Sequence, residues 1–275
     1  MKYALSPAGI ARICAFIGRD TLLAFDIDGT LAPIVDRPWD ARVPGDVQRA
    51  LKALSSHAVL AILTGRAVED ARPMLGFTPR YLIGNHGAEG VPGQERVSEG
   101  CARVCRAWLD ELASGSEPWR DVDGIVLEDK TYSLTFHYRH ARDQSAALRL
   151  LIARTARLLP LPRLIDGKKV LNLLPPSAPD KGQALAAVLA AARCKRALYV
   201  GDDVTDEAVF RLHSPAILSV RVEPDESSAA NLHLKGQRDV AKLVQELVRL
   251  IVPADSPRSP DARSGMKAGE SSAGA

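Results

Sequence analysis

Two patterns of apolar residues alternate along the chain: short continuous runs, and segments in which apolar residues recur at helical spacing. Continuous runs are typical of strands buried on both faces of a parallel sheet, and we predict them at 22–25, 58–63, 81–83, 197–200 and 216–222. Helical spacing predicts helices at 46–56, 68–75, 181–192 and 237–252. This order of elements predicts an α/β fold built on a Rossmann-like parallel sheet.

The middle of the chain is patterned differently. Leu134, Phe136 and Tyr138 alternate with polar residues, as in a half-exposed antiparallel strand, and Asp166-Gly167 is a hairpin-turn signal. We predict helices at 101–113 and 145–159, and strands at 124–126, 132–139, 163–165 and 169–174. The helix–hairpin–helix–hairpin order predicts a compact α+β domain that is inserted into the parallel-sheet fold.

These patterns suggest the domain boundaries. We expect one domain formed by residues 1–90 and 175–253, with the inserted domain at 91–174. Residues 254–275 are rich in Pro, Ser, Gly and Ala without apolar periodicity. That composition predicts a disordered tail.

Composition narrows the class of protein. With 46% hydrophobic and 25% charged residues, the chain is neither disordered, collagen-like nor a coiled coil. A net charge of +3 gives no reason to expect a nucleic-acid partner, because binding the phosphate backbone requires surplus Lys and Arg. No apolar run approaches the ~20 residues that cross a bilayer, and Arg12 and Arg19 interrupt any secretory signal. The four cysteines form no Cys-x-x-Cys pair, so we expect a cytoplasmic protein.

Two carboxylates, Asp26 and Asp28, directly follow the first buried strand. Like charges this close repel unless a cation or a shared proton stabilises them. Mg²⁺ prefers oxygen ligands and shares them with substrate phosphate, and Gly29 permits a tight backbone turn beneath a ligand. The pattern favours a metal-assisted phosphate site over a merely acidic turn.

Three further clusters follow predicted strands or begin a helix. Thr64-Gly65-Arg66 offers a hydroxyl and backbone N–H groups to a phosphate, although Thr-Gly also begins helices for structural reasons. Lys181 begins a helix, where its charge opposes the macrodipole and favours an anion-binding role. The run Gly201-Asp202-Asp203-Val204-Thr205-Asp206-Glu207 concentrates carboxylates that favour a metal. Ligands bind at the carboxyl ends of parallel strands, so we expect a single site.

In this order, the clusters resemble the haloacid dehalogenase superfamily of phosphatases, one class of which carries a cap domain where the insert lies. Within that superfamily the chain resembles the trehalose-6-phosphate phosphatases. Further matching motifs are Asn85-His86-Gly87-Ala88-Glu89, Leu127-Glu128-x-Lys130, His137-Tyr138-Arg139 and Gly167-Lys168. The resemblance covers about residues 22–252 and implies a hydrolase core with an α+β cap at 91–174.

The resemblance implies Mg²⁺-dependent hydrolysis of trehalose 6-phosphate to trehalose and phosphate, a step of trehalose biosynthesis. Asp26 would attack phosphorus and form an aspartyl-phosphate, and Asp28 would serve as general acid and then as general base. Thr64 and Lys181 would stabilise the transferring phosphoryl group. The implied metal ligands are Asp26, the backbone carbonyl of Asp28 and Asp202, with Asp203 and Asp206 holding metal-bound water or orienting Lys181.

The implied contacts to the sugar phosphate involve charged and polar groups, mostly in the cap: Arg66, Glu89, Glu128, Lys130, Arg139, Lys168 and Asn172. A solvated mixed-charge sheet face is the alternative for any one of the cap residues. Related enzymes usually carry Glu where this chain has Asn172. An amide can still bind hydroxyls but adds no negative charge.

Three alternatives remain open from the sequence. The nearest is a phosphatase for another sugar phosphate, such as sucrose phosphate or a glycosyl phosphoglycerate. A phosphomutase would use the same aspartyl-phosphate, and a non-catalytic sugar-phosphate sensor would not need the intact Asp26 and Asp28. We expect a small-molecule sugar phosphate as the partner and a monomeric protein.

Overall fold

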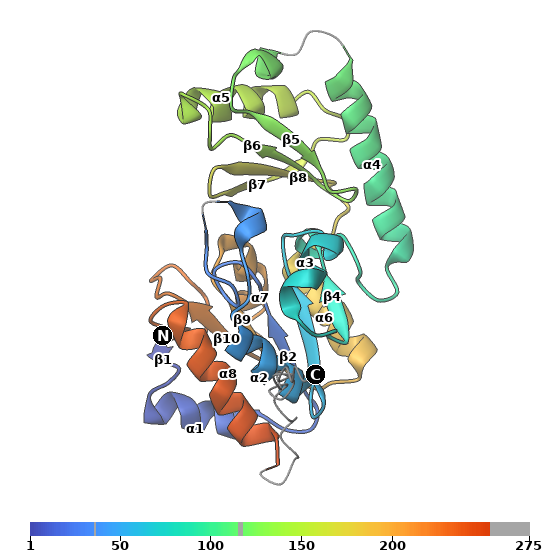
Figure 1. Ribbon diagram of the computed structural model, residues 1–275. Coiled ribbons are helices and arrows are strands. Elements are labelled where there is room, and N and C mark those ends of the chain that lie inside the picture. Colours follow the sequence, from blue (N-terminus) through green and yellow to red (C-terminus); the bar gives the residue numbers. More distant parts are fainter. Residues whose placement is uncertain (36, 115–117, 254–275) are drawn as a thin grey trace, which may run out of the picture.

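The computed structural model describes residues 1–35, 37–114 and 118–253, so the tail expected at 254–275 lies outside the described residues. Its larger domain is built on one parallel sheet in the order β1-β11-β10-β9-β2-β3-β4 (Figure 1). The strands are β1 (Lys2–Tyr3), β2 (Thr21–Phe25), β3 (Val59–Leu63), β4 (Tyr81–Ile83), β9 (Arg196–Gly201), β10 (Ile217–Val222) and β11 (Leu232–Leu234).

Helices cover both faces of this sheet, which confirms the predicted α/β class. One face packs against α1 (Pro7–Phe16), α2 (Gly45–Ser55), α3 (Val68–Leu75) and α8 (Arg238–Ile251). The other face packs against α6 (Lys181–Ala192) and α7 (Glu207–Phe210). Strands β2, β3 and β9 are almost wholly buried because both of their faces are covered.

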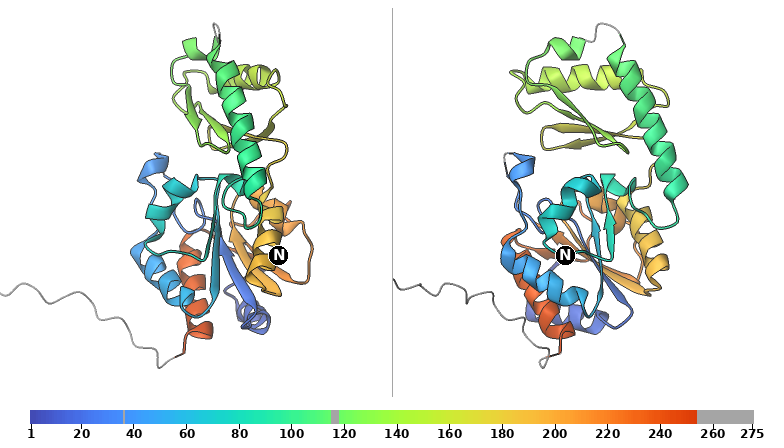
Figure 2. Two further views of the ribbon diagram at one scale, coloured as in Figure 1. Left: turned by 90° about the vertical axis from the view of Figure 1, so that its right-hand side faces the viewer. Right: turned by 45° about the vertical axis from the view of Figure 1, so that its right-hand side comes forward.

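The second domain is the cap, which lies above one edge of the parallel sheet (Figures 1 and 2). Its antiparallel sheet has the order β5-β6-β8-β7 and packs against two helices. The elements are α4 (Glu95–Ala113), β5 (Val126–Asp129), β6 (Leu134–His137), α5 (Gln144–Thr155), β7 (Arg163–Gly167) and β8 (Val170–Leu174).

Alternation along the cap strands separates two faces. Leu134 and Phe136 of β6 belong to the apolar core that includes Trp108 of α4. The intervening Thr135 and His137 line the cavity between the cap and the larger domain. The period of two in the sequence therefore gives the cap one apolar face and one polar face.

Several boundaries differ from those that the sequence predicts. The turn expected at Asp166-Gly167 is wrong: both residues belong to β7 and pair with β8, and the chain turns at Lys168-Lys169. This register places Leu171 and Leu173 in the cap core, and Lys169 adopts a φ of 67° in the turn. Core packing therefore overrides the local turn preference.

Some further elements were not predicted, and the ends of two predicted helices differ. Strands β1 and β11 are too short to show a sequence pattern of their own and were not predicted; α1 was not predicted either. The predicted helix at 101–113 begins earlier, at Glu95, and the one at 145–159 ends at Thr155. Among the described residues, no helix combines the length and hydrophobicity needed to cross a membrane.

Candidate active site

The predicted clusters meet at one edge of the parallel sheet. Strand β2 lies between β3 and β9, so the residues that follow these three strands are neighbours in space. A cavity of about 240 Å³ lies between this edge and the cap. Its core-side lining includes Asp26, Asp28, Gly65, Arg66, Lys181, Asp202 and Asp203. Its cap-side lining includes Glu128, Lys130, Thr135, His137, Arg139, Lys168 and Asn172.

Lys181 joins two of the acids at the floor of the cavity. Its Nζ lies 3.1 Å from Asp26 Oδ2 and 2.7 Å from Asp206 Oδ1, and all three side chains are buried. Asp180 caps α6 by accepting a hydrogen bond from Gln183 N, which fixes the start of the helix that carries Lys181. Burial alone would lower the pKa of Lys181, but Asp206 and Asp26 raise it. The ammonium group therefore stays charged beside the proposed nucleophile.

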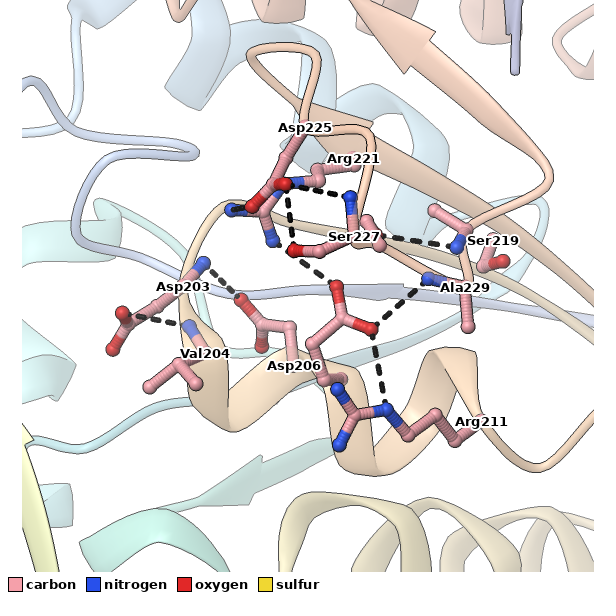
Figure 3. Close-up of polar contacts among 12 residues, drawn as sticks. Asp203, Val204, Asp206, Arg211, Ser219, Arg221, Asp225, Ser227 and Ala229 are labelled. Carbon is pink, nitrogen blue, oxygen red and sulfur yellow. Dashed lines mark hydrogen bonds and ion pairs between the residues drawn. The ribbon is translucent and has the colours of Figure 1, made fainter.

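Asp206 orients this lysine. Its Oδ2 accepts a hydrogen bond from Asp203 N at 2.9 Å (Figure 3). Its Oδ1 also accepts one from the Tyr199 hydroxyl at 2.6 Å. Both oxygens are thus engaged by donors from the protein. Tyr199 was not among the predicted residues, because its position in an apolar strand signals only burial.

Asp202 lies against the turn that follows Asp26. A Cβ on Gly29 would come within 2.0 Å of Asp202 Oδ2, and Gly29 has a φ of 80°. Only glycine fits this close approach without strain. The Thr30 hydroxyl donates a hydrogen bond to Asp202 Oδ1 at 3.1 Å. The sequence Asp-Gly-Thr thereby holds the second acidic cluster next to Asp26.

Lys181 alone does not balance the charge of the neighbouring acids, so they need either a shared proton or a further cation. Burial, followed by the charges of Asp206, Asp202 and Asp28, raises the pKa of Asp26 well above its ordinary value, although Lys181 opposes the shift. Burial and Asp206 raise the pKa of Asp202 to about 7. A carboxylate nucleophile in such surroundings needs a further counter-charge.

The donor atoms fit a hard divalent cation. Asp26 Oδ1 is buried and has no hydrogen-bond partner among the described residues. Asp26, Asp202 and Asp206 each bring an oxygen within 4.8 Å of the other two. Because Asp206 is already engaged by Lys181 and Tyr199, Asp26 and Asp202 are the side chains that would hold Mg²⁺. Asp203 lies beside them, where its carboxylate accepts a hydrogen bond from Val204 N.

Arg66 binds Asp28 through both of its carboxylate oxygens. Arg66 Nε donates to Asp28 Oδ2 and Nη2 donates to Oδ1, each at 2.6 Å. Such a two-point pair fixes the plane of the carboxylate. Thr64 lies deeper: it is 1% exposed, and its hydroxyl accepts a hydrogen bond from Arg66 N.

The cap contributes a cluster of three ionisable groups. Glu128 Oε2 lies 2.6 Å from His137 Nε2 and 3.7 Å from Lys130 Nζ. Burial raises the pKa of Glu128, but the hydrogen bond with His137 and the charge of Lys130 outweigh burial and lower it. In the sequence, His137 stands out only as part of the motif His137-Tyr138-Arg139. Its alternation with Phe136 is the signal that could have placed it in the site.

The remaining predicted contacts differ in how they face the cavity. Arg139 and Lys168 lie together at the rim, where Arg139 Nη2 donates to the Lys168 carbonyl at 3.2 Å. Asn172 is only 6% exposed; its Oδ1 accepts from the Thr135 hydroxyl and its Nδ2 donates to the Ile165 carbonyl. Asn172 therefore supports the polar face of the cap sheet.

Glu89 is turned away from the cavity lining. Its Oε2 accepts hydrogen bonds from Val68 N and Asn85 Nδ2, both at 2.8 Å. The carboxylate thus stabilises the first turn of α3. His86 does line the cavity, and its ring occupies the space that a Cβ on Gly65 would fill. Burial, reinforced by nearby cations, lowers the pKa of His86 well below its ordinary value.

A second polar network, outside the cavity, stabilises the loop that carries the acidic motif 201–207. Glu207 accepts a hydrogen bond from Ala229 N and pairs with Arg221 and Arg211, and Asp225 pairs with the other side of Arg221 (Figure 3). None of these residues lines the cavity. The Glu of the acidic motif is therefore a structural support for the segment that carries Asp202.

Known proteins share this architecture and these motifs. The model of the trehalose-phosphatase family matches residues 24–242. The chain is 30% identical over 243 residues to an uncharacterised glycosyl hydrolase of Mycobacterium tuberculosis, covering 84% of this chain and 18% of that protein. It is 28% identical over 260 residues to the trehalose-phosphate phosphatase of Mycobacterium bovis, covering 90% and 65%. The structure of Aspergillus fumigatus trehalose-6-phosphate phosphatase matches with a TM-score of 0.59 and 25% identity, covering 90% of this chain and 99% of that one.

The chain spans less than two thirds of the length of these two curated relatives. The matched segment nevertheless includes the whole cap, most of the larger domain and every acidic cluster of the cavity. The resemblance drawn from the sequence is thereby confirmed. The chain has a parallel-sheet core with an inserted cap and a cavity at their junction, and the family model matches most of its length. The protein therefore belongs to the trehalose-phosphatase family of the haloacid dehalogenase superfamily.

Proposed function

We propose that the protein is a Mg²⁺-dependent phosphatase that hydrolyses trehalose 6-phosphate to trehalose and phosphate. The observation that carries this proposal is the buried Asp26, which has Lys181 at 3.1 Å and one unpartnered oxygen. It lies in a cavity whose other wall is the polar face of the cap. This arrangement suits a phosphoryl group on the core side and sugar hydroxyls on the cap side.

In the proposed reaction Asp26 attacks phosphorus, and the bond to the sugar oxygen breaks as an aspartyl-phosphate forms. Asp28 gives its proton to the departing sugar oxygen and then takes one from the water that hydrolyses the acyl phosphate. Lys181 and Thr64 stabilise the negative oxygens of the transferring group. When bound by Asp26, the Asp28 carbonyl and Asp202, Mg²⁺ supplies charge neutralisation for the phosphate and the nucleophile.

Phosphate release from a substrate panel tests this function. The panel contains trehalose 6-phosphate, sucrose phosphate, a glycosyl phosphoglycerate and p-nitrophenyl phosphate, each assayed with added Mg²⁺. We expect the highest kcat/KM for trehalose 6-phosphate. Comparable turnover of all four would contradict the specific substrate, and the absence of any release would contradict phosphatase activity.

Two cap residues should contribute selectively to the sugar. We expect Glu128→Ala and Lys168→Ala each to lower kcat/KM for trehalose 6-phosphate by about one to two decades, the loss of roughly 1.5–3 kcal/mol from one charged hydrogen bond. Turnover of p-nitrophenyl phosphate should change little, because that ester does not reach the cap. Lys52→Ala, an exposed substitution on α2, is the control. Equal losses on both substrates would assign the two residues to folding or chemistry.

A groove beside the cavity offers space for the second sugar ring. It measures about 1000 Å³ and shares Arg66, Glu128 and Arg139 with the smaller cavity. Trp39 lines it with 66% of its surface exposed, on the segment between β2 and α2 that rises toward the cap (Figure 1). Large exposed aromatic surface beside a site is suited to the apolar face of a sugar ring.

Trp39→Ala should therefore raise KM for trehalose 6-phosphate by about fivefold, the scale of one aromatic contact of ~1 kcal/mol. The kinetics of p-nitrophenyl phosphate should stay within experimental error. Leu161→Ala removes a comparably exposed apolar side chain from the cap and serves as the matched control. An unchanged KM for Trp39→Ala would remove this residue from the sugar site.

We also propose a compartment and an oligomeric state for the protein. All four cysteines are free thiols, which suits the reducing cytoplasm. We expect a monomer, since both sides of the proposed site come from one chain. Size-exclusion chromatography with light scattering checks this, and a dimer mass would contradict it.

A further inference from the structure

Asn85 is a buried polar residue that the proposed mechanism does not use. It opens the single-turn helix Asn85–Gly87 after β4, is 0% exposed and has a φ of 50°. Asn is among the few residues that adopt such a conformation readily. A buried amide is costly unless its hydrogen bonds are made, so its partners show what holds it there.

The side chain of Asn85 reaches from the core into the cap. Its Oδ1 accepts a hydrogen bond from the Ser133 hydroxyl at 2.5 Å, and its Nδ2 lies 3.3 Å from the Lys130 carbonyl. The same Nδ2 donates to Glu89 Oε2 at 2.8 Å. Every polar atom of the amide therefore has a partner, and two of the three partners belong to the cap.

On the core side, the backbone of this turn is bound to the proposed phosphate loop. Asn85 N donates to the Arg66 carbonyl at 2.8 Å, and His86 N donates to the Thr64 carbonyl at 2.9 Å. Glu89, which Asn85 binds, also accepts from Val68 N just beyond that loop. These hydrogen bonds tie the turn to residues 64–66, which are proposed to face the phosphoryl group.

On the cap side, the partners form the tip of the β5–β6 hairpin. Lys130 N donates to the Ser133 carbonyl at 3.0 Å, which closes the tip. The Lys130 side chain is only 13% exposed and lines the cavity beside Glu128. The position of this tip relative to the core decides where the Lys130 ammonium lies above the phosphate loop.

We propose that Asn85 is a positioning residue that sets the sugar-binding hairpin of the cap relative to the phosphate-binding loop. This inference rests on the proposed function. A disaccharide phosphate must meet both walls of the cavity at once, so a small displacement between them weakens its binding. A small phosphate ester needs only the core wall. The coupling is therefore selective for the larger substrate.

Two single variants test the coupling from its two sides. Asn85→Gly removes the amide but accepts a positive φ, and Ser133→Ala removes the donor in the cap. We expect Ser133→Ala to raise KM for trehalose 6-phosphate about tenfold, the effect of one buried hydrogen bond, and Asn85→Gly to raise it at least as much, because it also removes the bonds to Lys130 and Glu89. In both variants kcat for p-nitrophenyl phosphate should stay within twofold of wild type. The double variant should lose no more than Asn85→Gly alone, because that substitution already removes the bond to Ser133.

Two further variants distinguish coupling of the hairpin to the core from a general loss of contacts between the two domains. Ser98→Ala removes another hydrogen bond between α4 and the core, from Ser98 Oγ to the Ala88 carbonyl at 2.9 Å, but it does not touch the hairpin. It should not change KM selectively. Asn85→Asp keeps the size of the side chain but places a carboxylate oxygen against Glu89 Oε2 and the Lys130 carbonyl, which both accept from Asn85 Nδ2. It should raise KM at least as much as Asn85→Gly, whereas a residue that only fills space would tolerate this isosteric change.

Hydrogen exchange gives a readout that does not depend on the substrate. In Asn85→Gly, the amides of residues 130–133 should exchange at least tenfold faster than in wild type, while those of the β2 strand stay protected. Unchanged exchange at the hairpin, or equal kinetic losses on both substrates, would overturn the coupling. If wild type shows no preference for trehalose 6-phosphate, the proposed function fails, and the exchange result still decides the role of Asn85.

Discussion

Replacement of Asp26 by Asn is expected to abolish phosphate release on every substrate, with a loss on the order of 10⁴-fold or more. An amide is far less nucleophilic than a carboxylate, and Asp26 is the acid in contact with Lys181 that keeps an unpartnered oxygen. Rapid-quench labelling with a ³²P-phosphorylated substrate measures the intermediate directly. Wild type should carry acid-stable, base-labile phosphate, and the variant should carry none.

The comparison requires that the variant still folds. Asn is nearly isosteric with Asp, and it replaces a buried carboxyl whose pKa is raised well above its ordinary value by burial and by the neighbouring acids. Far-ultraviolet circular dichroism should therefore match that of wild type. Asp46→Asn, an exposed substitution on α2, is the matched control and should retain full activity. Substantial turnover by Asp26→Asn would exclude Asp26 as the nucleophile.

Removal of divalent cations is expected to have the second largest effect. Treatment with EDTA should reduce turnover to background while the circular dichroism spectrum is retained, because the apolar strands, and not the acidic cluster, form the core. Added Mg²⁺ should restore activity. Asp202→Ala should show the same loss without restoration, whereas Asp225→Ala, an acid outside the cavity, should respond to Mg²⁺ like wild type. Full activity after EDTA treatment would contradict the metal-dependent mechanism.

The same site predicts a dependence on pH. The pKa of Asp202 is raised to about 7, so the folded protein holds a proton there that the unfolded chain releases near its ordinary, lower pKa. This contribution favours folding at low pH and is lost as the pH rises through about 7. A cation must displace that proton. The increase in Tm caused by Mg²⁺ should therefore be larger at pH 8 than at pH 6, as measured by scanning calorimetry; the opposite order would count against Asp202 as a ligand.

The larger domain could be predicted in outline because its signals are local. Continuous apolar runs require burial on both faces, and each run that ends in Asp26, Thr64 or Asp202 marks where a strand leaves the sheet. Parallel strands bring those ends to one edge as a matter of geometry. The sequence alone therefore predicted the edge of the sheet at which these residues gather.

The cap could be predicted only in part. Alternation along β6 identified a sheet with one apolar and one polar face, but the Asp166-Gly167 turn was assigned from local preference and was wrong. Register depends on which side chains pack against the helices, as Leu171 and Leu173 do. The register is therefore set by packing across the whole cap, and the sequence of the turn itself does not indicate it.

The roles of individual polar groups were decided by tertiary structure. Asn172 lines the cavity as expected, but its amide is also bonded to Thr135. Glu89, expected at the sugar as well, does not line the cavity and is bonded to Val68 N and Asn85. Tyr199, which supports Asp206, was missed. By itself the sequence determined the central strands of the parallel sheet, the sheet edge and the residue types that gather there. Only the folded chain decided which donor meets which acceptor, because hydrogen bonds form between groups that are distant in sequence and are selected by packing, whereas apolar patterns record only whether a position is buried.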